Sequence, residues 1–178
     1  MGDRLTLPEW NALASQPDDT VPLLETALLI ARDEYPDLDA DLYDTLAQSH
    51  AEHLRPEIEA IEAWPLKMAA INRHLFDELG YTGNHDEYYD PRNSYLDEVF
   101  ERRLGNPITL AMVQMEVARR LGVPLDGVSS PGISWCGYRS TTASWSWTRS
   151  MVGGRWAPTS CVNAPSHTWA ATFRTTTR

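Results

Sequence analysis

The last part of this 178-residue chain, residues 127–178, contains no Asp, no Glu, no Lys and no Leu. Natural soluble domains use all four residue types heavily, so this composition is not that of an ordinary folded domain. Residues 1–126 show the opposite bias, because they hold all 25 acidic residues, ten basic residues and no cysteine. The chain therefore changes character abruptly near residue 126.

Three further absences limit the functions to be considered. No apolar run approaches the length of a membrane span, and the N-terminal MGDRLTLPEW lacks the apolar core of a signal peptide, so we expect a cytoplasmic protein without a membrane partner. The net charge of residues 1–126, 10 − 25 = −15, argues against nucleic acid as a partner. Cys136 and Cys161 have no companions at metal-ligand spacing, so the sequence predicts no metal site and no cofactor. It gives no indication of an oligomeric state.

Amphipathic patterns predict that most of residues 20–121 is helical, with the acidic residues on solvated faces. Thr20 is the expected N-cap of the first of these helices and Ser94 that of a later one. Pro56 suits the first turn of the third helix, and Pro65 should kink or split it. The expected helices are 20–34, 39–54, 56–80, 94–105 and 109–121. No strand-like alternation and no internal repeat occurs in residues 1–126.

The segment YYDPRNSYLDEVFERRLGNPITLAMVQMEVARRLGVPLDGV is the most specific part of the sequence. It resembles the bacterial transglutaminase-like family of the SirB type, closely over residues 90–128 and loosely, by helical character, over 20–89. The resemblance implies an α+β core of the papain-like superfamily. In such a core, a helix that carries the nucleophile packs on an antiparallel sheet that bears a His and an Asp.

The resemblance also assigns positions to the expected catalytic groups. In active relatives a Cys opens the helix, an Ala follows four residues later, and a Gly-Ile-Pro turn begins fifteen residues after the Cys. Counting back from Gly122 places the Cys at Pro107 and the Ala at Ala111. Acyl transfer of this kind needs an activated thiolate, which proline cannot supply. Thr109 and Ser94 are the nearest hydroxyls, so we predict no catalytic residue in this chain.

The remaining polar positions of the matching segment are candidate binding residues. They are Arg92, Asn93, Arg102, Arg103, Asn106 and Thr109. One interpretation is that they line a groove or bind a ligand. The alternative is structural: Asn93 is a turn residue, Thr109 an ordinary helix residue, and the arginines pair with the surplus acids.

The composition of the C-terminal segment suggests a change of reading frame. If the intended codons lie one base earlier, every Trp codon of this segment becomes that of an aliphatic residue. With GC-rich codons chosen for the other residues, residues 131–154 then reconstruct as PGHFLVRLPVDDGLLVMDPFNGGR; the aliphatic residues and the Asp at the position of Thr148 do not depend on that choice. That string contains two strand-like runs around a turn, with His at the position of Ile133 and Asp at the position of Thr148. The alternatives are a genuine tail whose Trp and Arg bind sugars or single-stranded nucleic acid, or Cys136 acting as a nucleophile with His167.

Together these observations predict a mainly α fold. A helical N-terminal region, 1–89, precedes the start of the transglutaminase-like core, 90–130. Residues 131–178 form an out-of-frame, poorly structured tail. The sheet of the α+β core is therefore expected to be largely missing or scrambled. The expected function is that of a truncated, non-catalytic, regulatory protein that binds a protein or peptide partner. The alternative is a transglutaminase-like or cysteine-hydrolase enzyme, which would need a thiol at the start of the helix.

Overall fold

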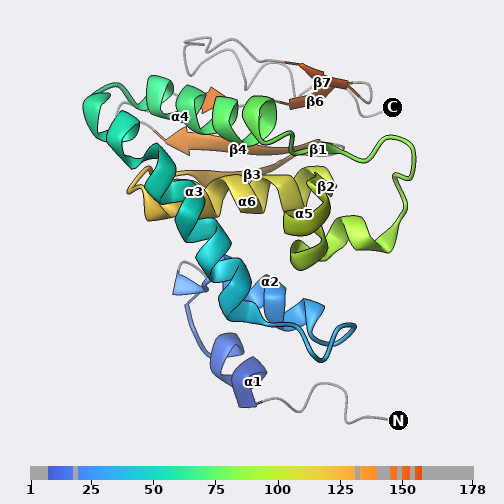
Figure 1. Cartoon of the computed structure of the whole chain (residues 1–178). Helices are drawn as coiled ribbons and strands as arrows, with labels where there is room; N and C mark the ends of the chain where they lie inside the picture. The colour runs from blue at the N-terminus through green and yellow to red at the C-terminus, as the bar shows by residue number, and fades with distance from the viewer. Residues whose placement is uncertain are drawn as a thin grey trace, which may run out of the picture.

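The computed structural model of the protein describes residues 8–17, 20–130, 133–139, 145–147, 150–152 and 155–157. Helices account for most of this part of the chain, and the strands are short, which confirms the predicted mainly α fold class (Figure 1). The helical elements are α1 (Pro8–Ala14), α2 (Leu23–Ala31), α3 (Ala40–Ala60), α4 (Trp64–Asn72), the π-helix η2 (Arg73–Glu78), the 3₁₀-helix η3 (Pro91–Ser94), α5 (Leu96–Arg102) and α6 (Pro107–Arg120). None of the described helices is both long enough and apolar enough to cross a lipid bilayer.

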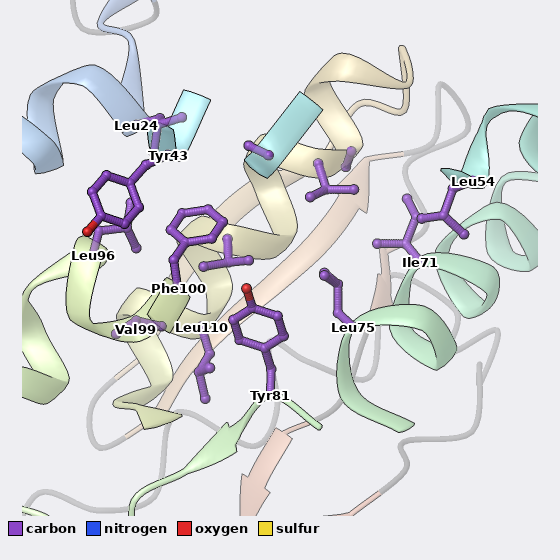
Figure 2. Packing of buried hydrophobic residues seen from close by; sticks show 14 of the residues in the cluster. Leu24, Tyr43, Leu54, Ile71, Leu75, Tyr81, Leu96, Val99, Phe100 and Leu110 are labelled. Carbon is purple, nitrogen blue, oxygen red and sulfur yellow. The ribbon is translucent and has the colours of Figure 1, made fainter. Parts of the chain in front are cut away.

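Helix α6 is the centre of the fold. Helices α2, α3, α4 and α5 all contact it, and strands β3 and β4 run alongside it (Figure 1). Its apolar positions recur every three or four residues, and Leu110, Val113 and Val117 are almost completely buried. In Figure 2, Tyr81 and Phe100 point into the same cluster, between Leu75 and Val99. The helix expected to carry the nucleophile is therefore held rigidly by packing on several sides.

The strands form three small sheets. Strands β1 (Thr82–Gly83) and β2 (Leu104–Gly105) pair in parallel. Strands β3 (Asp126–Ser130), β4 (Ile133–Arg139) and β5 (Trp145–Trp147) form an antiparallel sheet in the order β3-β4-β5, with Val128 opposite Trp135 and Gly137 opposite Trp147. Strands β6 (Ser150–Val152) and β7 (Arg155–Ala157) pair separately.

Part of the segment expected to be poorly structured thus contains strands, β4 to β7. The rest of residues 131–178 lies outside the described residues, and the boundary at residue 130 stays a prediction. The antiparallel arrangement beside α6 matches the layout that the family resemblance implies: one helix packed on a sheet.

Several helix boundaries differ from the sequence prediction. Pro56 does not begin a helix, because α3 continues through it to Ala60. The buried positions Leu54 and Ile58 lie on either side of Pro56, and their burial offsets the cost of about 3 kcal/mol for an internal proline. The N-cap of α2 is Pro22 rather than Thr20. Pro65 does split the helical run, since α4 begins at Trp64 with the proline in its first turn.

The third difference concerns Ser94, which was expected to cap a helix. Residues Pro91–Ser94 instead form the 3₁₀-helix η3, and the N-cap of α5 is Tyr95. The Ser94 hydroxyl accepts a hydrogen bond of 3.1 Å from Nδ2 of Asn106, so this side chain is engaged by the next element rather than by its own helix.

Candidate functional site

The N-terminus of α6 is the position at which the family resemblance places the nucleophile. Its cap is Asn106, whose Oδ1 accepts hydrogen bonds of 2.9 Å from the backbone N–H groups of Ile108 and Thr109. The N–H of Leu110 donates to the carbonyl oxygen of Asn106, and Pro107 has no N–H. All donors of the first turn are thus satisfied within the protein, and none is free to stabilise an oxyanion.

Thr109 is held by the same network. The hydroxyl, in a side chain almost fully buried, donates to the carbonyl oxygen of Asn93 at 2.8 Å and accepts from the backbone N–H of Asn106 at 3.1 Å. Gly105 allows this close approach, because a Cβ at residue 105 would lie 2.8 Å from Thr109 Oγ1. Among the described residues, the hydroxyl contacts no side chain that could act as a base, so its observed role is structural.

Asn93 connects this turn to the preceding loop. Its side chain is buried; Nδ2 donates to the carbonyl oxygens of Glu87 and Tyr88, and Oδ1 accepts a 3.1 Å hydrogen bond from Asn84. A buried amide with all of its bonds made within the protein fixes a loop conformation. Asn93, Asn106 and Thr109, three of the predicted binding residues, are therefore brought together.

The three arginines among the candidates lie around this network and have partners of their own. Arg92 forms an ion pair of 2.7 Å with Asp90, whose pKa is lowered chiefly by this hydrogen bond, and Arg102 lies 3.5 Å from the same carboxylate. Arg103, at the left-handed C-cap of α5, donates to the carbonyl oxygen of Leu79 at 2.8 Å. Their binding role stays a prediction.

The positions assigned to the catalytic groups can be compared with the fold. Pro107 is the first residue of α6, and Ala111 lies one turn further along the helix. Ile133, at the expected position of the His, begins β4, which contacts α6. Thr148, at the expected position of the Asp, lies outside the described residues, as does His167, the proposed base for Cys136. Helix α6 and β4 are in contact, as the family resemblance implies, but the first residue of the helix is proline.

The other end of α6 carries a buried acid. Glu116 is 3 % exposed and accepts hydrogen bonds of 2.7 Å from both Arg119 and Arg120. Burial alone would raise the pKa of Glu116, but the two arginines outweigh it, so the pKa is lowered and the group stays ionised. Arg120 also forms a short ion pair with Asp44 and thereby ties α6 to α3.

Sequence reasoning missed one cluster of titratable residues, formed by His50, His53, His74 and Glu78 on α3 and η2. Burial, followed by the neighbouring His74, lowers the pKa of His50 to about 4. The spacings His-x-x-His and His-x-x-x-Glu were visible in the sequence as pairs on one helical face. Their meeting was not, because it depends on how α3 and η2 pack.

Comparison with known proteins agrees with this architecture. The family model of the Transglutaminase-like superfamily matches residues 40–147. A UPF0162 protein of Xylella fastidiosa (strain 9a5c) is 73 % identical over 132 residues, which cover 74 % of this chain and 47 % of that protein. A UPF0162 protein of Vibrio cholerae is 33 % identical over 78 residues, 41 % of this chain and 29 % of that protein.

A more distant similarity reaches the mouse protein "F-box only protein 21", which is 33 % identical over 155 residues, 73 % of this chain and 25 % of that protein. The chain spans about half the length of the Xylella proteins that it matches. No solved structure matches it. The family match over residues 40–147, together with a central helix packed on an antiparallel sheet, shows that this chain belongs to the transglutaminase-like superfamily.

Proposed function

We propose that this chain is a SirB-type, non-catalytic member of the superfamily, acting in the cytoplasm as a regulatory protein that binds a protein or peptide. The observation that carries the proposal is Pro107 at the first position of α6, where the family resemblance expects a thiol. The surrounding geometry supports it. Thr109, the nearest hydroxyl on the helix, is buried and donates to a backbone carbonyl. The first-turn N–H groups are occupied by Asn106.

The competing function is thiol-based acyl transfer or hydrolysis, which superfamily membership favours in general. Such chemistry requires a nucleophile, a base within hydrogen-bond reach and a third group that orients the base. Residues 1–126 contain no Cys, so a thiol nucleophile would have to come from Cys136 or Cys161. Any activity that thiol alkylation abolishes would therefore point to the C-terminal segment.

We further propose that the reading frame changes after about residue 128. The support is compositional: residues 127–178 have five Arg but no Lys and no acid, and the shifted frame yields an Asp and, with GC-rich codons, a His where the family expects them. Sequencing the gene across the codons for residues 125–132 tests this. The proposal expects PGHF and DPF one frame over. An early stop codon in that frame would contradict it.

The functional proposal is tested by measuring amine incorporation and peptide hydrolysis for three proteins: this chain, the frame-corrected chain, and the frame-corrected chain with Pro107→Cys. We expect no activity from the first two. Activity that appears only with the introduced thiol would support the proposal. Activity of the frame-corrected chain without it would refute the non-catalytic assignment, and Thr109→Val would then show whether that hydroxyl is responsible.

A further inference from the structure

The cluster formed by His50, His53, His74 and Glu78 lies away from the start of α6. His50 and His53 are three residues apart on α3 and therefore share a face of that helix. His74 belongs to the π-helix η2, and its ring stacks on that of His53, with centroids 4.8 Å apart and an interplanar angle of 23°. The ring of His50 meets His74 edge-on at 5.6 Å. Three imidazoles are thus gathered between two elements.

His74 is the central residue of this cluster. It is 5 % exposed, and its Nδ1 lies 3.0 Å from Oε2 of Glu78. Its Nε2 is buried and has no hydrogen-bond partner within the described part of the chain. Nδ1 of His74 and Oε2 of Glu78, 3.0 Å apart, are about as close as two ligands of one tetrahedral ion, so Nδ1 is the atom through which His74 can bind such an ion.

One donor atom from each of His53, His74 and Glu78 can be chosen so that all three lie within 4.8 Å of one another. Ligands of a tetrahedral ion with bonds of about 2.0–2.1 Å stand about 3.3 Å apart, so the atoms must approach by somewhat more than 1 Å. The side chains of His53 and Glu78 are exposed, so they can shift by that amount around the fixed ring of His74. The buried ligand is rigid, and the two exposed ligands can adapt to it.

The nearby charges permit such an ion. Arg73 contacts Oε1 of Glu78 at 3.1 Å, but it also forms a 2.6 Å ion pair with Glu57, which offsets its charge. Oε2 of Glu78, the oxygen that faces His74, is not the one that Arg73 contacts at 3.1 Å. Arg103 is the other cation that acts on this cluster, through His50. Two carboxylates, Glu57 and Glu78, therefore balance the guanidinium beside the site.

We propose that His53, His74 and Glu78 bind one divalent transition-metal ion of the Zn²⁺ class and so link α3 to η2. Two imidazoles and one carboxylate suit Zn²⁺ and its first-row neighbours rather than Mg²⁺ or Ca²⁺, which prefer all-oxygen sites. Three protein ligands leave one position for water, and the exposure of His53 and Glu78 gives the ion a path from solvent. The sequence predicted no metal site, because its ligands come from two helical elements.

The experiment titrates the full chain with ZnCl₂ by calorimetry and with CoCl₂ by absorption spectroscopy. Cys136 and Cys161 are alkylated beforehand in every sample, so that their thiols do not compete for the metal. The variants are His53→Gln and Glu78→Gln, which change exposed side chains and should leave the fold intact. His85→Gln, at an exposed histidine outside the cluster, is the matched control.

We expect one Zn²⁺ per chain, a Co²⁺ visible absorption typical of nitrogen and oxygen ligands, and no binding of Mg²⁺. His53→Gln and Glu78→Gln should each weaken Zn²⁺ binding at least tenfold, whereas His85→Gln should leave it unchanged. The proposal is overturned if the alkylated chain binds no Zn²⁺ saturably, or if its affinity survives both cluster substitutions. It is equally overturned if His85→Gln weakens binding as much as they do.

Discussion

Replacing Asn106 by Ala should destabilise the protein in a way that separates capping from ligand binding. The Asn106 side chain is the acceptor for the N–H groups of Ile108 and Thr109, and no other group takes over that role. Ile108 is exposed, so water can replace its lost bond, but Thr109 is buried. Loss of an N-cap costs typically about 1 kcal/mol and up to about 2 kcal/mol, and the buried N–H of Thr109 places this site in the upper half of that range.

The assay is urea denaturation followed by far-UV circular dichroism, with thermal melting as a second readout. A loss of about 1.5 kcal/mol should lower the melting temperature by roughly 3–6 °C in a chain of this size. Asn106→Asp is the matched control, because it keeps both acceptor bonds and adds a negative charge at a helix N-terminus. It loses only the hydrogen bond to Ser94, so its stability should stay within about 0.5 kcal/mol of the native chain.

Two results would refute this reasoning. If Asn106→Ala has the same melting temperature as the native chain, Oδ1 is not needed as a cap, and Asn106 becomes a stronger candidate for ligand binding. If Asn106→Asp loses as much stability as the Ala variant, the essential group is the amide Nδ2 rather than the acceptor oxygen.

Two further perturbations test the packing around α6. Gly105→Ala should lower the free energy of unfolding, measured by urea denaturation, by about 1–3 kcal/mol, because the new methyl group would lie 2.8 Å from Thr109 Oγ1. Adding Thr109→Ala should recover part of this loss. If the losses of the two single variants simply add in the double variant, that contact is not the cause. Arg120→Met should lower the free energy of unfolding by about 2 kcal/mol and Arg119→Met by clearly less, since Arg120 is the more buried partner of Glu116. Equal losses of stability in the two variants would contradict this. Because the folded pKa of Glu116 is lowered, the ionised carboxylate stabilises the fold above the unfolded pKa of about 4.3, and this stabilisation is lost as the pH falls through the folded pKa. The Arg120→Met variant has already lost part of it, so its free energy of unfolding should fall less between pH 7 and pH 3 than that of the native chain.

The sequence was informative where a local pattern and burial act together. The α6 helix has an apolar face of regular period, a proline suited to a first turn and a glycine after its end, and it was predicted to within two residues at its start. Local rules failed where tertiary packing outweighed them. Pro56 would start a helix in isolation, but the apolar face of α3 continues past it into the core.

In the candidate site, too, features set by local sequence were predictable and contacts set by tertiary packing were not. The amphipathic pattern predicted a helix from Thr109, whereas the family resemblance pointed to Pro107, which is the residue that begins α6. The engagement of Ser94 by Asn106 could not be foreseen, because the two residues are twelve positions apart and meet only when η3 packs on α6. The histidine cluster was missed for the same reason: each pair has a helical spacing, but only the packing of α3 against η2 joins them.

The most direct test of a non-catalytic helix terminus is to trap an acyl group on it. The native chain and Pro107→Cys are incubated with an activated glutaminyl ester, digested, and mapped by mass spectrometry over residues 88–126. The account predicts an adduct on the introduced thiol and no acylated residue in that segment of the native chain. An acyl group on Thr109 or Ser94 that forms only in the folded native protein would contradict it.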